Sequence, residues 1–249
     1  MNNKLWININ TKYWNGLAKR YNSLYNDEWS IQENNYISEK LNSLELKTND
    51  KIIDLGCGTG LGYSLLKNNK SLNYQGLDVS EEMLNVLKLE FPNAGIINSK
   101  MSDLSMIESN SISVVISIFT SFSYTDDIDN TILEISRILK PNGKVLISVL
   151  SRYSLRRVLG LKFGVIEHYK TRGTISKEFS EAWDFTEKSL ETAFKKYNFI
   201  NIKIEGYNPF AGFSFLTKKF PKLWRLNLKF AKFFPFFSHE LLLTSEISK

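Results

Sequence analysis

A glycine-rich turn behind an acidic residue carries the clearest chemistry in this sequence. Residues 51–60 read Lys-Ile-Ile-Asp-Leu-Gly-Cys-Gly-Thr-Gly, so an apolar β-type run contains Asp54 and is followed by a glycine turn. Glycines let the backbone of such a turn adopt positive φ and pass close to a ligand. The dinucleotide pattern Gly-x-Gly-x-x-Gly would need a third glycine where Tyr63 stands, and Asp54 would repel a diphosphate. The turn therefore favours a ligand that carries a cationic amine.

Alternating strands and helices would place this turn at one edge of a sheet. The apolar and β-branched runs predict strands at residues 51–55, 73–79, 94–98, 113–119 and 144–150, with helices between them. Ser80 has the character of an N-cap, since Glu81 and Glu82 follow it. The alternation predicts an α/β fold with a parallel sheet wound on both faces, whose ligands bind beyond the carboxyl ends of the strands. Asp54, Asp78 and the residues after Phe119 all lie at those ends.

The segments on either side of this alternation have a different character. Residues 1–45 are predicted to be helical, because Trp14, Leu17, Tyr21, Leu24 and Tyr25 form one apolar stripe at helical spacing and a second run follows. The alternation ends after Leu150, and residues 151–180 are basic. A helix from Thr186 to Lys196 and strands at 199–207 and 240–248 complete the predicted elements.

A basic and aromatic segment precedes the last predicted strand. If residues 215–234 form one helix, Pro221 lies in its first turn and a basic stripe runs along it, made of Lys218, Lys222, Arg225, Lys229 and Lys232. Such a helix could lie at an anionic membrane surface, or it could cover a substrate pocket with its basic face in water. We favour the cover, because its apolar face then has a core or a pocket to pack against.

Composition limits the classes that remain. The chain has 249 residues, of which 43% are hydrophobic, enough for one large α/β domain. A formal charge of +6 is compatible with an acidic or phosphorylated substrate. The single cysteine excludes an internal disulfide and favours a cytoplasmic location. The two histidines and one cysteine give no metal-ligand spacing, so we expect no metal. No uncharged apolar run has the length of a membrane span.

Five motifs together resemble the class I S-adenosylmethionine-dependent methyltransferases. They are Ile52–Gly60, Leu77–Leu84, Lys100–Ser105, Val115–Asp127 and Leu139–Leu150. S-adenosylmethionine carries an ammonium and a sulfonium, which is the positive charge that Asp54 favours. The resemblance implies a single domain over 1–249, with a Rossmann-like, doubly wound sheet of seven strands whose last strand is antiparallel. It also implies an N-terminal helical lid at 1–45 and substrate-side insertions at 151–184 and 208–238, the second of them a C-terminal helical insertion.

The same resemblance assigns cofactor contacts position by position. Asp54 and the loop of Gly56, Cys57 and Gly58 would hold the methionine part of S-adenosylmethionine. Asp78 would accept both ribose hydroxyls, as a carboxylate can. Val79 and Met83 would flank the adenine, and Met101, Ser102 and Asp103 would line its edge. Lys100 stands where relatives have an acid, so the adenine amino contact falls to Asp103, to a backbone carbonyl, or to nothing. Ser117 and Phe119 would pass beneath the sulfonium.

The resemblance implies an enzyme that methylates an acceptor by in-line attack on the sulfonium methyl. A general base is needed only if the nucleophile is protonated; His168 is the first candidate, with Tyr124 and Tyr169 behind it. We favour the simpler interpretation that His168 is a solvated loop histidine. Tyr21, Tyr25, Phe122 and Tyr169 are the candidate substrate contacts. His239 is expected to be structural.

We expect a small-molecule acceptor with an oxygen, nitrogen or carbon nucleophile. The aromatic and basic flanking segments suit a flat or hydrophobic molecule with negative charge. Three alternatives remain open: a membrane-surface enzyme of a lipid or quinone-type intermediate, an RNA or protein methyltransferase, and a non-catalytic subunit that binds S-adenosylmethionine. No nucleic-acid-binding module is visible.

Overall fold

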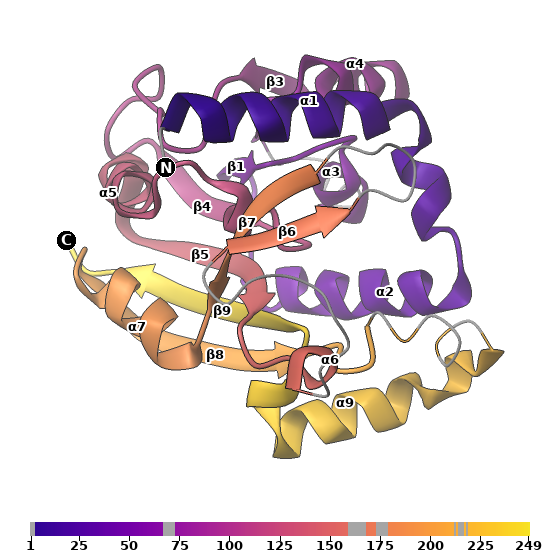
Figure 1. Ribbon diagram of the computed structural model, residues 1–249. Helices are drawn as coiled ribbons and strands as arrows, with labels where there is room; N and C mark the ends of the chain where they lie inside the picture. Colours follow the sequence, from indigo (N-terminus) through magenta and orange to yellow (C-terminus); the bar gives the residue numbers. More distant parts are fainter. Residues whose placement is uncertain are drawn as a thin grey trace.

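A mixed sheet forms the centre of the molecule. The computed structural model describes residues 3–66, 73–158, 168–172, 179–211, 213, 217 and 219–249. Within these ranges the sheet has nine strands, surrounded by helices (Figure 1). Five of them are parallel and adjacent in the order β3 (Gly95–Asn98), β2 (Asn73–Asp78), β1 (Lys51–Leu55), β4 (Ile112–Ser117) and β5 (Leu139–Ser151). Because the chain passes from β3 back to β4, the order reverses between β1 and β4, where such sheets bind ligands.

The far side of β5 confirms the predicted antiparallel last strand. β9 (Glu240–Ile247) pairs antiparallel with β5, and β8 (Phe199–Tyr207) pairs antiparallel with β9, so β8 runs parallel to β5. A further hairpin of β6 (His168–Arg172) and β7 (Phe179–Phe185) joins β5 at Leu150 and Ser151. The basic composition of residues 151–180 gave no sign of these two strands, so the nine-stranded sheet exceeds the predicted seven by this hairpin.

Two apolar layers follow from the alternation of side chains along each strand. Ile53, Val115 and Ile147 face α5 (Ile128–Ile138) and α7 (Glu187–Lys195). Their neighbours Ile52, Val114 and Leu146 face the opposite layer, formed by α2 (Glu28–Asn42), α3 (Leu61–Leu66) and α4 (Glu81–Glu90). The sheet is therefore buried on both faces, which explains why its strands are continuously apolar.

Side-chain caps fix where the helices begin. The Ser80 hydroxyl accepts a hydrogen bond from the Met83 N–H at 3.2 Å, and Thr186 with Ser189 forms a reciprocal capping box at the start of α7. Asp127 accepts from the Asn130 N–H at 3.0 Å at the start of α5. Each cap satisfies a backbone donor that has no partner inside the helix. The predictions of helix starts after Ser80 and Thr186 are confirmed.

The two N-terminal helices pack against different elements, and the first of them ends at Tyr21. α1 (Asn3–Tyr21) contacts α4 and β7, whereas α2 lies beside α9 (Trp224–Phe233) (Figure 1). The short 3₁₀ helix η1 (Asn22–Tyr25) joins them, and Asp27 caps α2. Leu24 and Tyr25 are 40% and 48% exposed, so the predicted apolar stripe ends at Tyr21. Asparagine at 22 and 26 and the Asp27 cap favour this break.

The predicted helix over 215–234 is shorter than expected. Pro221 begins a 3₁₀ turn, η3 (Pro221–Leu223), and α9 starts only at Trp224. Proline restricts the preceding residue to extended backbone, which separates Phe220 from the helix. Lys218 lies outside the described residues, so the basic stripe described by the structure runs from Lys222 to Lys232. Two short elements complete the fold: α6 (Leu155–Val158) and η4 (Pro235–Phe237).

Phe122 belongs to the core and not to the substrate surface assigned to it from the sequence. It lies in the 3₁₀ helix η2 (Ser121–Tyr124) after β4, is completely buried, and packs at centroid distances of 6.2 Å from Phe185 and 6.0 Å from Phe194. The ring packs into the apolar layer against α7 because the turn after β4 points it toward that layer.

We predict that Phe122→Ala lowers the free energy of unfolding by about 3–5 kcal/mol, the usual cost of removing a buried phenylalanine ring. Leu89→Ala is the matched control, because Leu89 is 82% exposed. Urea denaturation followed by circular dichroism measures both values. A Phe122→Ala variant as stable as the control would place this ring outside the core.

Candidate functional site

The glycine loop after β1 adopts a conformation that only glycine tolerates well. Gly56 and Gly58 have φ of 73° and 52°, in the left-handed region. A Cβ on Gly56 would lie 2.5 Å from Met101 Cε and 2.6 Å from Ser121 Cβ. A Cβ on Gly58 would meet no atom within 4 Å, so this residue borders open space. The loop is therefore packed on one side and open to a ligand on the other.

Asp78, at the end of β2, ties the loop to the next strand. Its Oδ2 accepts the Gly58 N–H at 2.9 Å, and its Oδ1 accepts the Ser80 N–H at 2.8 Å. Burial raises the pKa of Asp78, and these backbone donors oppose that rise. A carboxylate has about four acceptor positions, so two of them remain for a ligand. This arrangement fits the vicinal hydroxyls of a ribose.

A cavity opens in front of Asp78 and the glycine loop, and we call it the cofactor cavity. It encloses about 730 Å³ of space, open solvent at its mouth included, which is within the usual range for small-ligand sites. Both polar and apolar residues line it. Its predicted members are Tyr21, Gly56, Gly58, Asp78, Val79, Met83, Met101, Phe119 and Tyr124.

Helix α1 closes this cavity on the side away from the sheet. Trp6, Ile7, Asn10 and Trp14 line it. The Trp6 ring stacks on Trp183 of β7 at 5.1 Å between centroids, and its indole N–H donates to the Tyr124 carbonyl at 3.2 Å. The hairpin of β6 and β7 therefore supports α1 over the site. Sequence reasoning placed a lid over 1–45 but did not identify Trp6, whose partner lies in the unpredicted hairpin.

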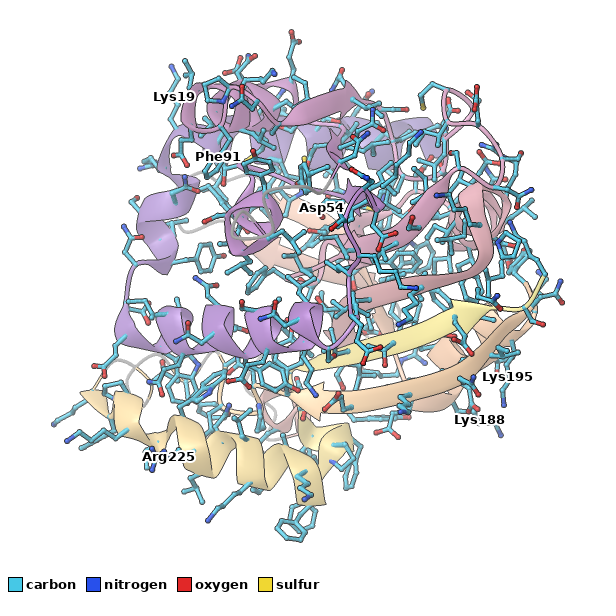
Figure 2. All side chains as sticks on the ribbon, turned by 180° about the vertical axis from the view of Figure 1, so that it is seen from behind. Lys19, Asp54, Phe91, Lys188, Lys195 and Arg225 are labelled. Carbon is cyan, nitrogen blue, oxygen red and sulfur yellow. The ribbon has the colours of Figure 1, made fainter. Side chains whose placement is uncertain are left out.

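Asp54, which was expected to hold the methionine part together with the loop, lies beneath that loop and does not line the cofactor cavity. Figure 2 marks Asp54 in the interior of the molecule, where it is completely buried. Its Oδ2 accepts the Tyr74 hydroxyl at 2.8 Å. Burial raises its pKa to about 7, against the opposing effect of the Tyr74 hydrogen bond. A Cβ on Gly62 would lie 2.2 Å from Oδ2. Asp54 is thus a support of the loop and of the start of α3.

Four other residues that were predicted to bind the cofactor also contact other parts of the protein instead of the cavity. The Ser117 hydroxyl donates to the Leu55 carbonyl at 2.7 Å, and the Cys57 side chain is buried in the apolar layer against α4. Ser102 is buried and donates to Asp126 at 2.6 Å. Asp103 accepts hydrogen bonds from the Ser105 N–H and hydroxyl. None of the four lines the cofactor cavity.

Asp126 lines the cofactor cavity, whereas Asp103 does not. It lies beside Lys100, whose Nζ is 3.4 Å from its Oδ2. Sequence reasoning quoted the motif that contains Asp126 but assigned no role to it. The only available signal was that an acid follows the fourth strand, while the partner Ser102 is 24 residues away.

A second cavity, the acceptor cavity, adjoins the first. Tyr21, Phe119 and Tyr124 line both. Phe119 and Thr120 have φ of 51° and 62°, a strained geometry for residues other than glycine, and such strain commonly marks functional turns. The larger cavity encloses about 1370 Å³, open solvent included, between α2, the glycine loop and the start of β9. Two cavities of ligand size therefore adjoin each other at a shared aromatic border.

The structure places the candidate bases and substrate contacts in different surroundings. His168 and Tyr169 belong to β6, where their backbones pair with Trp183 and Ala182, and their side chains lie outside the described part of the structure. Tyr124 lies at the border of the two cavities. Tyr25 lines the acceptor cavity. His239, expected to be structural, lines that cavity as well, next to Glu240.

Among the described residues, no group of three or more His, Cys, Asp or Glu side chains is placed to hold a metal ion. Each helix in that part of the chain is too short or too polar to span a membrane.

Comparison with known proteins relates this architecture to methyl transfer. A profile of the methyltransferase domain matches residues 53–147. The ubiquinone/menaquinone biosynthesis C-methyltransferase UbiE of Campylobacter jejuni is 32% identical over 193 residues, which are 73% of this chain and 77% of that protein.

Solved structures share the fold. A putative S-adenosylmethionine-dependent methyltransferase from Listeria monocytogenes has a TM-score of 0.63 at 16% identity, over 88% of this chain and 100% of that one. The putative methyltransferase solved with the Trm112 activator of Haloferax volcanii has a TM-score of 0.62 at 19% identity, over 95% and 98% of the two chains.

We predict that Asp78→Asn weakens binding of S-adenosylmethionine at least about tenfold, because an amide replaces one of the two acceptor oxygens. Asp103→Asn is the control, since Asp103 makes its hydrogen bonds to Ser105 outside the cavity. Isothermal titration calorimetry measures both affinities. If Asp103→Asn lost more affinity than Asp78→Asn, the placement of the ribose would be wrong.

Proposed function

Because the chain belongs to the class I S-adenosylmethionine-dependent methyltransferases, we propose that it methylates a small-molecule acceptor held in the acceptor cavity. The observation that carries this proposal is the border that Tyr21, Phe119 and Tyr124 form between the two cavities. Residues of α1, α2, α4 and β9 surround the acceptor space, which favours a small molecule over a polymer. We place the reaction in the cytoplasm, in keeping with the single cysteine.

The residues of the chain would bind and orient the reactants. S-adenosylmethionine supplies an activated methyl group on its sulfonium. Asp78 would hold the ribose, with Val79 and Met101 as apolar walls for the adenine and Asp126 as an acceptor at its edge. Trp6 and Trp14 of α1 would exclude water from the bound nucleoside. Since the donor is already activated, alignment and desolvation are the main contributions of the protein.

Tyr124 would orient the acceptor at the border between the cavities. We predict that Tyr124→Ala lowers kcat at least about tenfold, because loss of the ring frees the acceptor from its aligned position. Tyr153→Ala is the control, as Tyr153 is 52% exposed beyond β5. The assay measures formation of S-adenosylhomocysteine with libraries of small amines, phenols and alcohols, and with RNA and peptides as separate arms.

The outcome separates the functional classes. Turnover with a small acceptor supports the proposal, whereas turnover with RNA or peptides alone would assign the protein to the RNA or protein methyltransferases. Binding of S-adenosylmethionine without turnover in any arm would indicate a non-catalytic subunit.

A second candidate is methylation of a lipid or quinone-type intermediate at a membrane surface. The observation that favours it is the outer face of α9 and its neighbours, where Leu226 is 52% and Phe233 75% exposed. Phe220, Phe234 and Phe236 are each 46% exposed around them. The exposed cations beside these rings are Lys219, Lys222, Arg225, Lys229 and Lys232. No described residue of α9 lines either cavity, which argues against the substrate cover expected from the sequence.

Exposed rings beside cations are typical of helices that lie in a lipid interface. The inner face of α9 is already packed, since Trp224 meets Trp29 of α2 at 5.0 Å between ring centroids. The similarity to a quinone-pathway methyltransferase supports the same candidate.

We predict that Lys222→Gln/Arg225→Gln weakens binding to phosphatidylglycerol-containing vesicles, by about 1 kcal/mol for each charge removed. The control is Lys188→Gln/Lys195→Gln on α7, which Figure 2 shows at a different edge from Arg225. Vesicle co-sedimentation at low and high salt measures the difference. Equal losses in the two variants would mean that the attraction is only a general effect of net charge.

A further inference from the structure

The acceptor cavity has a charge opposite to that of the protein as a whole. Three glutamates from separate elements line it: Glu33 of α2, Glu90 at the end of α4 and Glu240 at the start of β9. No lysine or arginine is among the described residues that line this cavity, although the chain carries a net charge of +6. The expectation of an anionic acceptor, drawn from the basic flanking segments, therefore disagrees with the walls of the cavity.

Two of these carboxyl groups form a hydrogen-bonded pair. Glu240 is buried, and Glu33 shares a hydrogen bond with it. The Asn208 side chain donates to Glu33 Oε1 at 2.8 Å, and the Tyr207 hydroxyl donates to Glu240 Oε2. The Trp29 indole N–H holds the Asn208 oxygen at 3.0 Å. Asn208 and Tyr207 donate as neutral groups, whereas the hydrogen bond between the two carboxyl groups needs one shared proton, so the pair then carries one negative charge.

Aromatic rings complete the cavity. Tyr21, Tyr25, Phe91, Phe119 and Tyr124 line it together with the glutamates. The Tyr21 and Tyr25 rings lie 5.1 Å apart between centroids, at an interplanar angle of 52°. Aromatic faces attract cations, and the attraction increases where water is excluded. Carboxylates and aromatic faces converge here in a space that adjoins the methyl donor.

We propose that the acceptor is a cationic amine whose ammonium group binds between the Glu33–Glu240 pair and the aromatic walls of the acceptor cavity. This inference rests on the proposed function, because it names the substrate class of the same site. It also predicts methyl transfer to nitrogen rather than to oxygen or carbon.

The carboxyl pair could also prepare the amine for reaction. An ammonium nitrogen has no lone pair, so it must lose a proton before it can accept a methyl group. The proton would pass from the nitrogen to a carboxylate oxygen of the pair, leaving a neutral amine and a carboxylic acid. Burial raises the pKa of Glu240 to about 7 and raises that of Glu33, so the pair can hold a proton near neutral pH.

The groups that face the pair define its pH dependence. They are Tyr21 from α1, Tyr25 from η1, Asp27 before α2, Tyr207 from β8 and His239 before β9. Burial raises the pKa values of the three tyrosines, so they stay neutral near pH 7. Ammonium binding should therefore weaken as pH falls below about 7, because protonated carboxyl groups lose their attraction for a cation.

The test uses three probes of similar shape and different charge. These are 2-phenylethylamine, 2-phenylethanol and 3-phenylpropanoate, each titrated into the complex of the protein with S-adenosylhomocysteine. We expect the amine to bind at least about tenfold more tightly than the alcohol, and the carboxylate most weakly. The preference for the amine should decrease between about pH 8 and pH 5.5, as the carboxyl pair takes up protons.

Matched variants locate the effect. Glu240→Gln should remove the preference for the amine, whereas Glu108→Gln, at an exposed position between β3 and β4, should keep it. Thermal unfolding verifies that both variants are folded, and Glu33→Gln provides a second measurement if Glu240→Gln is not. S-adenosylmethionine affinity should be unchanged in all three.

Three results would overturn the inference. One is an amine that binds no more tightly than the alcohol. Another is a preference for the amine that survives in both pair variants. The third is loss of S-adenosylmethionine affinity in Glu240→Gln, which would mean that the pair holds the ammonium of the cofactor instead. Failure of the unmodified protein to bind S-adenosylmethionine would instead contradict the proposed function.

Discussion

The Asp78 carboxylate connects two parts of the protein that border the cofactor cavity. One oxygen holds the Gly58 N–H of the loop after β1, and the other holds the Ser80 N–H at the start of α4. Because β1 and β2 are paired throughout, these two bonds fix the loop relative to the strand ends. The open side of Gly58 and the open positions of Asp78 then face the same cavity. A single acid thus defines both the shape and the polarity of the cofactor cavity.

Support for this arrangement comes from buried groups on both sides. Asp54 and Tyr74 hold the loop from beneath, while Trp6 on Trp183 holds α1 above it. The strained turn at Phe119 and Thr120 is anchored by the Ser148 hydroxyl, which accepts the Thr120 N–H at 2.6 Å. This anchoring offsets an unfavourable backbone conformation that costs roughly 1–3 kcal/mol for each residue. The aromatic border between the cavities depends on that turn.

Local patterns predicted the sheet and the cofactor loop well. β1 and β8 have the predicted bounds, and the family's antiparallel last strand is present at Glu240–Ile247. Local patterns could not show which way each side chain points. Asp54 and Ser117 occupy the expected strand positions, but their side chains bond to Tyr74 and to the Leu55 carbonyl. Only some of the side chains at a strand end face the ligand. The alternation of side chains along a strand does not tell which polar side chain instead forms hydrogen bonds within the protein.

The acceptor side was the least predictable because its residues are far apart in sequence. Contacts form between Glu33 of α2, Asn208 directly after β8 and Glu240 of β9. No spacing in the sequence predicts these contacts. Net charge was also misleading, since the cations of α9 lie on an outer face whereas the carboxyl groups lie inside. The charge of the surface and the charge of a cavity are separate properties, and the sequence gives only the net charge of the whole chain.

The most direct test is a crystal structure of the protein with S-adenosylmethionine bound. The ribose hydroxyls should lie on Asp78, the adenine between Val79 and Met101, and the sulfonium toward the border formed by Tyr21, Phe119 and Tyr124. The ligand at any other place, or with its ribose away from Asp78, would contradict the account.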